Sequence, residues 1–341
     1  MVKKRAAKRL NLFGNRAFYF FNRRIFNKIK NITDCIFSKM MYNVKDKICL
    51  RNGGSPLMRP IKIFVDSTAD LSPELIAKYD LTVIPLYVTI GGKAYKDMYE
   101  IKAQDIFDNY NKNKELPKTA AVSVADYFEA FRPVVEAGYD IIHFNISSDF
   151  SACYQNACIV SGELGHVYPV DSRNLSTGIA QLALLAAEEA AKGETDAEHI
   201  AEYIRTVIPR VDVSFVLNNL EFLHKGGRCS GVAALGANLL KLKPCIEVTE
   251  GKMGVGKKYR GSFEKCASEY IRDRLRDDDT VDLHRIFLTW SGCDRELIDS
   301  LKEEIKSYHN FEEVLDTEAG STISGHCGPG CLGILYIHKE K

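Results

Sequence analysis

The chain has 341 residues, of which 45% are hydrophobic, and its 46 Lys and Arg nearly balance its 45 Asp and Glu. This composition excludes a disordered, collagen-like or coiled-coil protein, and the length allows one large domain or two of medium size. No window approaches 18 uninterrupted apolar residues, so no membrane-spanning helix is expected. The ten cysteines form no CxxC pair and mostly lie singly in apolar stretches, which predicts free thiols in a reducing compartment and a cytoplasmic protein.

The balanced total hides a basic leader and an acidic body. Residues 1–60 hold 15 Lys and Arg but 2 Asp and Glu, a formal charge of +13, whereas the remaining residues hold 31 and 43. We expect residues 1–60 to be an extension outside the fold, with Met58 as an alternative start of translation. The mixture of arginines and aromatics also fits a basic amphipathic segment at a membrane surface or an acid-poor targeting peptide. Nucleic-acid binding by this leader has no motif to support it.

The stretch 61–211 alternates predicted strands and helices. The apolar run 61–65 is typical of a buried strand, and Ser72, Pro73 and Glu74 then supply the N-cap, first residue and first-turn acid of a helix. Further strands are predicted at 81–90, 140–146 and 167–170, and helices at 125–135, 152–164 and 176–191. This alternation predicts an α/β domain with a mainly parallel sheet covered by helices.

The pattern changes beyond about residue 212. Strands are predicted at 213–217, 244–249, 257–260, 286–290 and 334–338, with helices at 263–275 and 295–308. Gly251, between Glu250 and Lys252, is typical of a hairpin turn. The stretch 212–341 therefore predicts a smaller α+β domain packed against the first.

A cluster of serines lies between the strand predicted at 140–146 and the helix predicted at 152–164. Unpaired backbone N–H groups at a helix start attract anions, and the hydroxyls of Ser147, Ser148 and Ser151 could add hydrogen bonds there. The sequence thus indicates an anion site. N-capping of the helix by one of these serines is the alternative.

The glycine-rich stretch 325–333 is a second candidate. It contains GPGCLG, a formal match to the dinucleotide pattern GxGxxG, but that pattern must open a helix after a strand, and here a predicted strand follows it. We therefore reject a nucleotide site and predict a loop that closely approaches another segment, with His326 at its start. A metal site on His326, Cys327 and Cys331 is not expected, because no fourth ligand lies at zinc spacing.

Two basic segments could bind an anion or a partner. The Gly-Gly pair before Arg228 predicts a loop that projects a guanidinium, which suits a carboxylate or phosphate, with a plain surface arginine as the alternative. The cluster 257–260 is equally typical of a solvated strand end. The chain has no GxSxG, HExxH, Walker loop or paired-carboxylate pattern, which favours a binding protein over an enzyme.

Taken together, these segments resemble the DegV family, bacterial fatty-acid-binding proteins that include the lipid-binding subunit of fatty-acid kinase. The resemblance covers about 62–338. Its motifs, in chain order, are VDSTAD at 65–70, PKT at 117–119, ISSDFS at 146–151 followed by Tyr154-Gln155, VDS at 170–172, LEFL at 220–223 followed by KGGR at 225–228, LKP at 242–244 and HCGPG at 326–330. It implies a two-domain DegV-like fold, a fatty acid held in a tunnel between the domains, and a place in phospholipid metabolism.

The resemblance also implies roles for individual residues. In the family a threonine and a serine bind the fatty-acid carboxylate and a histidine orients the threonine, and these positions are Thr119, Ser151 and His326. Supporting positions in the same loops are Ser147, Ser148, Ala152 and Gly328. Two arginines that engage a separate kinase chain correspond to Arg228 and Arg260. That kinase would use ATP to phosphorylate the bound carboxylate, so this chain is expected to need no cofactor.

This chain departs from the family pattern close to the expected site. Thr119-Ala120 stands where the family usually has Thr-Ser, and Ser151-Ala152-Cys153 stands for Ser-Gly-Thr. The usual Asp-Gly is Asp97-Met98. The two lost hydroxyls could shift the headgroup preference, but the three retained side chains predict an intact carboxylate site. Two alternatives stay open: an acyl hydrolase or phosphotransferase with Ser151 as nucleophile and His326 as base, and a membrane-tethered interaction protein driven by the leader.

Overall fold

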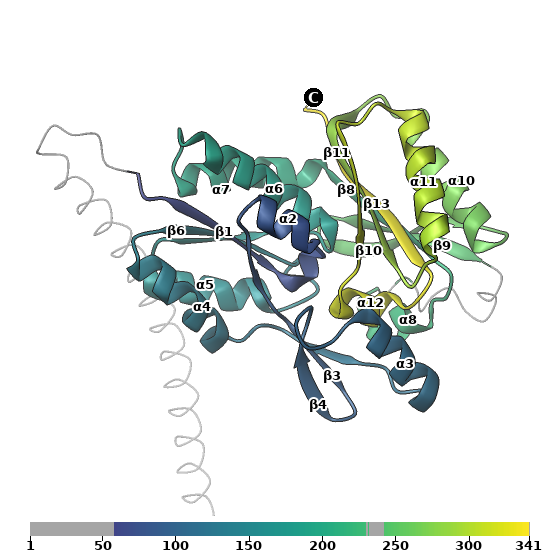
Figure 1. The fold of residues 1–341 in the computed structure, drawn as a ribbon, viewed down its shortest axis with the longest axis horizontal. Helices are drawn as coiled ribbons and strands as arrows, with labels where there is room; N and C mark the ends of the chain where they lie inside the picture. Colours follow the sequence, from purple (N-terminus) through teal and green to yellow (C-terminus); the bar gives the residue numbers. More distant parts are fainter. Residues whose placement is uncertain (1–57, 230, 232–241, 341) are drawn as a thin grey trace, which may run out of the picture. The chain divides into compact units, whose positions relative to one another are not determined.

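The computed structural model describes residues 58–229, 231 and 242–340. Arg59 onward forms one compact unit (Figure 1). The basic leader predicted at 1–60 falls almost wholly outside the described residues, so the expectations for it stay predictions. Within the described part of the chain, no helix is both long enough and apolar enough to cross a bilayer.

The first sheet is parallel, as the alternation of strands and helices predicts. Its strand order is β2-β1-β6-β7. The strands are β1 (Ile61–Asp66), β2 (Thr82–Ile84), β6 (Asp140–Asn145) and β7 (Val167–Asp171). Helices α4 (Val124–Glu136) and α5 (Cys153–Leu164) lie on one face, and α6 (Thr177–Lys192) and α7 (Ala197–Val207) on the other (Figure 1). Every residue of β6 is buried, as expected for a strand covered on both faces.

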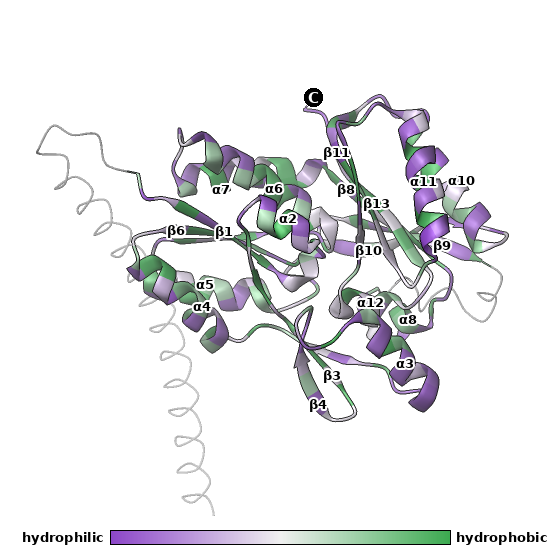
Figure 2. Ribbon diagram, viewed as in Figure 1, coloured by the Kyte–Doolittle hydropathy of each residue, from purple (hydrophilic) through white to green (hydrophobic). Residues whose placement is uncertain are grey.

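The second sheet has six strands in the order β10-β9-β8-β13-β11-β12. The strands are β8 (Val211–Leu217), β9 (Lys243–Thr249), β10 (Lys252–Tyr259), β11 (Val281–Ser291), β12 (Glu313–Glu318) and β13 (Cys331–His338). Only the β11–β12 pair is parallel, and α11 (Arg295–Tyr308) connects these two strands. Helices α10 (Phe263–Leu275) and α11 pack on this sheet and turn polar residues to solvent (Figure 2). The fold is therefore the two-domain α/β arrangement expected from the sequence.

Helix α6 lies between the two sheets. Its residues are buried on all sides over most of its length, which explains an Ala/Leu-rich sequence without a polar face. Gln181 donates from Nε2 to the carbonyl oxygens of Arg285 and Leu335, both at 3.1 Å. A Cβ on Gly178 would lie 2.6 Å from Val213 Cγ2, so glycine allows α6 to approach β8. One hydrophobic core consequently spans both halves of the fold.

A third, small sheet corrects the strand predicted at 81–90. That segment is interrupted at Pro85 and Leu86, and its second part, β3 (Tyr87–Ile90), pairs with β4 (Lys93–Lys96) and β5 (Lys118–Ala120). A proline has no N–H to give to the ladder, so the strand leaves the first sheet there. The domain boundary predicted between residues 211 and 212 falls at the first residues of β8, directly after the short 3-10 helix η3 (Ile208–Arg210).

Several short elements have no counterpart in the sequence predictions. These elements are η2 (Ser67–Ala69), η3, α3 (Ala103–Asn113), α8 (Glu221–Gly226) and α12 (Ser321–Cys327), together with α7, β4, β5 and β12 described above. The prediction that His326 starts a loop is wrong, because His326 lies in the last turn of α12. The close approach predicted for the glycine loop is confirmed: a Cβ on Gly328 would lie 2.7 Å from Phe222 Cδ2.

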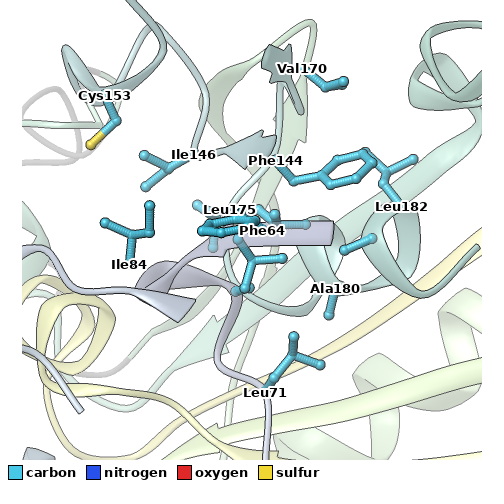
Figure 3. Packing of buried hydrophobic residues seen from close by; sticks show 14 of the residues in the cluster. Phe64, Leu71, Ile84, Phe144, Ile146, Cys153, Val170, Leu175, Ala180 and Leu182 are labelled. Carbon is cyan, nitrogen blue, oxygen red and sulfur yellow. The ribbon is translucent and has the colours of Figure 1, made fainter. Parts of the chain in front are cut away.

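Aromatic rings pack tightly under the first sheet, within the core shown in part in Figure 3. The Phe131 ring centroid lies 5.5 Å from Phe64, 5.3 Å from Tyr127 and 5.2 Å from His143. We expect Phe131→Ala to lower the free energy of unfolding by about 3–5 kcal/mol, because it leaves a cavity among fully buried rings. Urea denaturation followed by circular dichroism measures this loss. Ile159→Ala on the neighbouring α5 is the control, since Ile159 is 56% exposed. Equal losses for the two variants would contradict the assignment of this core.

Candidate functional site

A cavity of about 490 Å³ lies at the carboxyl edge of the parallel sheet. Leu86, Ile146 and Leu175 line it and follow the carboxyl ends of β2, β6 and β7. The strand order reverses between β1 and β6, so the loops after these strands diverge and leave a crevice, the usual place for a ligand in an open α/β sheet. The topology therefore places a binding cavity here independently of any motif.

Three polar side chains from distant segments line this cavity. Thr119 comes from β5, Ser151 from the loop before α5, and His326 from α12. Thr119 Oγ1 lies 2.9 Å from His326 Nε2, although 207 positions separate the two residues. The structure thus brings the three residues singled out in the sequence onto the wall of one cavity.

The surroundings of His326 indicate which ring nitrogen carries the proton. Nδ1 is buried and has no hydrogen-bond partner among the described residues, and a Cβ on Gly226 would lie 2.5 Å from it. A buried N–H without an acceptor is rarer in proteins than an underused acceptor. We therefore assign the proton to Nε2, which then donates to Thr119 Oγ1. The Thr119 hydroxyl hydrogen is left free for an acceptor in the cavity.

The His326 ring is neutral at physiological pH. Burial lowers its pKa from the ordinary 6.5 to about 4, and the positive charge of Arg228 adds to this shift. Arg228 is exposed, lines the cavity, and donates from Nη1 to the carbonyl oxygen of Gly226 at 2.8 Å. His326 therefore acts in this site as a hydrogen-bond donor without a charge.

Ser151 is the serine of its loop whose hydroxyl can turn to the cavity. Its Oγ accepts from the Cys153 backbone N–H at 3.3 Å and donates to Cys153 Sγ at 3.1 Å, a weak acceptor. The alternative of a serine N-cap is wrong, because the N-cap of α5 is Ala152, with no side-chain cap bond.

The other two serine hydroxyls have strong partners. Ser148 Oγ donates to Asp171 Oδ2 at 2.6 Å. Ser147 is fully buried, does not line the cavity, and donates to the carbonyl oxygen of Gly251 at 2.9 Å. Both serines therefore fix the loop.

The remaining residues expected from the sequence are placed as follows. Ala152 lines the cavity, whereas Gly328 lies outside its wall and packs on Phe222. The Gly226-Gly227 pair projects Arg228 to the rim, as predicted. Arg260 is exposed just after β10 and does not line the cavity.

A large part of the cavity lining is apolar. It is lined by Leu86, Ile146, Phe150, Leu175, Met253 and Ile323. Leu175, Ile323 and Cys327 also border a second, apolar cavity of about 30 Å³, which continues toward Val213, Phe215, Trp290 and Leu335 beneath the second sheet. The site therefore offers a ligand both hydrogen-bonding groups and apolar surface.

Sequence reasoning missed how α12 is held and that Thr322 lines the cavity. Asp70 accepts from the Gly320 N–H at 2.8 Å and from Ser176 Oγ at 2.6 Å, and Asp97 accepts from the Thr322 N–H at 3.3 Å and from the Ser321 hydroxyl. Asp70 and Asp97 stand in segments noted above, but their partners at the start of α12 lie more than 220 positions later in the chain. No local pattern could reveal these contacts.

No cluster of three metal-ligating side chains occurs among residues 58–229, 231 and 242–340. Cys327 and Cys331 are buried and free of disulfides. A hydrogen bond with Cys327 and the burial of its own thiol raise the pKa of Cys331. These side chains therefore contribute to the core.

The fold and the site define an α/β protein with a cavity at the carboxyl edge of its parallel sheet, lined by both polar and apolar side chains. The family model described as an uncharacterised protein of the DegV family matches residues 60–339, so this chain belongs to the DegV family. A DegV domain-containing protein of Clostridium acetobutylicum is 31% identical, and the match covers 83% of this chain and 100% of that protein. A Thermotoga maritima protein named fatty acid-binding protein is also 31% identical, with coverages of 80% and 96%.

Solved structures agree with this assignment. The structure of a DegV family protein from Thermus thermophilus, described as fatty acid binding, has a TM-score of 0.74 and 29% identity. The match covers 82% of this chain and all of that one. A DegV lipid-binding protein of Thermotoga maritima has a TM-score of 0.72 and 27% identity, with coverages of 82% and 99%.

The depressed pKa of His326 has a measurable consequence. In the unfolded chain this ring becomes protonated as the pH falls below about 6.5, whereas in the folded chain it becomes protonated only as the pH falls below about 4. The contribution of His326 to stability is therefore complete above pH 6.5 and is lost as the pH falls toward 4. We expect NMR titration of the His326 ring to give a midpoint near 4, and Arg228→Gln to raise it. A midpoint near 6.5 in the native protein would contradict this site geometry.

Proposed function

We propose that this protein binds a long-chain fatty acid, with its carboxylate at Thr119 and Ser151 and its tail in the apolar part of the cavity. The observation that carries the proposal is the 2.9 Å contact between Thr119 Oγ1 and His326 Nε2 on the wall of a cavity that also has a large apolar lining. The fatty-acid-binding names of relatives from Thermotoga maritima and Thermus thermophilus support it.

The two ends of such a ligand contribute in different ways. Burying sixteen methylenes supplies roughly 12 kcal/mol of gross transfer free energy at about 0.8 kcal/mol each, and this term favours any greasy molecule. A carboxylate taken out of water is costly unless it receives hydrogen bonds. The free hydrogen of Thr119 and the weakly held hydrogen of Ser151 supply them, and both favour the ionised headgroup. Selectivity for an acid therefore depends on the polar end.

We also infer that the bound carboxylate is presented to a separate ATP-dependent kinase that converts it to an acyl phosphate. The resemblance to the lipid-binding subunit of fatty-acid kinase implies this step. Two features of the surface support it: Arg228 is exposed at the rim of the cavity, and Arg260 is exposed at the end of β10. Arginine suits either a phosphate or an acidic partner surface.

The geometry favours binding over hydrolysis or phosphotransfer by this chain alone. His326 Nε2 contacts Thr119, and no Ser151–His326 bond joins the two residues that an enzyme would need as nucleophile and base. Within the described segments, His326 Nδ1 also has no partner that would orient the ring. An activated serine requires both contacts.

We expect Ser151→Ala to weaken fatty-acid binding by about 1–3 kcal/mol, because one carboxylate oxygen loses its donor. Displacement of a fluorescent fatty acid from delipidated protein measures the change. Ser307→Ala removes an exposed hydroxyl from α11 and is the control. An unchanged affinity would remove Ser151 from the site. Mass spectrometry of lipid extracted from the protein purified from its host tests the ligand class directly.

The kinase step is tested by charge reversal outside the cavity. We expect Arg260→Glu to keep fatty-acid affinity within about twofold but to slow acyl-phosphate formation by an added fatty-acid kinase about tenfold. Charges at the edge of a protein–protein interface mainly affect the association rate. Arg276→Glu, an exposed site after α10, controls for net charge. Equal rates for the Arg260 and Arg276 variants would refute this contact.

A further inference from the structure

The turn of the β9–β10 hairpin lies against the loop that carries Ser151. The two strands pair up to Thr249 and Lys252, so Glu250 and Gly251 are the central residues of the turn. Both have a positive φ, 51° and 82°, as the favoured two-residue hairpin turn requires. The hairpin belongs to the second sheet, whereas the Ser151 loop follows β6 of the first sheet. Contacts between the turn and the loop therefore join the two domains.

Ser147 is the residue through which the turn reaches Ser151. It is fully buried, and its Oγ donates to the carbonyl oxygen of Gly251 at 2.9 Å. Its N–H donates to the carbonyl oxygen of Asn174 at 2.9 Å. Its own carbonyl oxygen accepts from the N–H of Phe150 at 2.9 Å and from the N–H of Ser151 at 3.3 Å. One buried residue thus links the turn to the backbone of Ser151.

Arg173 holds the other side of the turn. Its Nη2 donates to the carbonyl oxygen of Glu250, and its Nη1 lies 3.0 Å from Asp149 Oδ2. The Nζ of Lys252, at the start of β10, lies 3.9 Å from the same carboxylate. Asp149 and Met253 both line the cavity, one from each domain. The contacts of the turn therefore join two walls of the cavity.

Glycine at position 251 allows this close approach. A Cβ there would lie 2.8 Å from Arg173 Cζ and 2.8 Å from Ser147 Oγ. Gly92 holds the matching position in the two-residue turn between β3 and β4, with a φ of 75°, and a Cβ there would meet nothing within 4 Å. Tight packing is therefore a property of the β9–β10 turn and not of hairpin turns in general.

We propose that Ser147, Arg173, Glu250 and Gly251 form an interdomain clasp that positions the Ser151 loop for the headgroup. Ser147 and Arg173 are its positioning residues. This inference rests on the proposed fatty-acid binding and names what makes the site selective for an acid. A donor held in place before the ligand arrives loses less freedom on binding, so it contributes more to affinity.

The charge of Arg173 adds a second effect on the same ligand. Asp149 is a carboxylate on the cavity wall, and Arg173 pairs with it. Without this partner, the Asp149 charge would repel a bound carboxylate. Loss of Arg173 thus combines a loss of position with a change in charge, and a test has to separate the two.

The first test compares hexadecanoic acid with its methyl ester, which has the same tail but no charge. We expect Gly251→Ala to weaken binding of the acid about three- to tenfold and to leave binding of the ester unchanged, because the headgroup donor moves and the apolar lining stays. Gly92→Ala is the matched control, since it places the same methyl group on a positive φ without a clash. Equal losses for acid and ester, or an acid affinity equal to that of Gly92→Ala, would overturn the proposal.

The second test separates position from charge. We expect Arg173→Met to weaken the acid but not the ester, again about three- to tenfold. The loss should persist when Asp149→Asn is added, because the contact with Glu250 is still missing. Native acid affinity in the double variant would show that Arg173 acts only through charge and would overturn its positioning role.

A third measurement needs no ligand. Amide hydrogen exchange followed by NMR reports local opening of the loop. We expect the N–H groups of Phe150 and Ser151 to exchange about tenfold faster in Gly251→Ala and at the native rate in Gly92→Ala, because only the first variant disturbs Ser147. Unchanged exchange would overturn the clasp even in a protein that binds fatty acids. Faster exchange in a protein whose native form binds neither compound would support the clasp and refute the proposed function.

Discussion

The site depends on the anchoring of the seven-residue helix α12. Its N-terminal end is held by Asp70 and Asp97, and its last turn by the Thr119–His326 hydrogen bond. All three partners lie more than 200 positions earlier in the chain. A helix this short is not stable alone, and Ser, Thr and Gly are weak helix formers, so tertiary contacts must fix it. The position of His326 in the cavity is therefore a consequence of the whole fold.

The ionisable groups around the cavity are arranged so that few negative charges face a bound anion. Burial, with a smaller effect from Asp97, raises the pKa of Asp70 to about 8, so this carboxyl is largely neutral at pH 7. The charge of Asp149, which lines the cavity, is paired with Arg173 at 3.0 Å. Arg228 lines the cavity as a cation on the exposed rim. If the ligand is the fatty acid proposed above, this distribution would draw its carboxylate toward the rim and leave the interior to hydrogen-bond donors.

Local sequence patterns predicted much of the fold. The elements that they predicted wrongly or not at all depend on contacts between residues far apart in the chain. The helices expected at 263–275 and 295–308 have those bounds in α10 and α11, because N-caps and hydrophobic spacing act within a few residues. The strand at 140–146 is found as β6. Pro85, by contrast, ends a strand that apolar spacing alone extended to residue 90, and α12 was missed because its stabilising carboxylates lie far away in sequence. The motifs placed Thr119, Ser151 and His326 on one cavity, whereas Ser147 and Gly328 proved to hold the surrounding loops.

The departures from the family pattern bear directly on the proposed recognition of a headgroup. By the resemblance described above, Ala120 and Cys153 stand where the family usually has hydroxyl residues, so fewer oxygen donors could converge on an anion here. Fewer donors make the orientation of each remaining one more important, since a single misplaced hydroxyl leaves a buried carboxylate oxygen unpaired. In this chain that orientation comes from buried partners: the neutral His326 ring directs Thr119, and the thiol of Cys153 holds Ser151. For the proposed ligand, selectivity for an acid would thus depend on side chains behind the cavity wall as much as on those that line it.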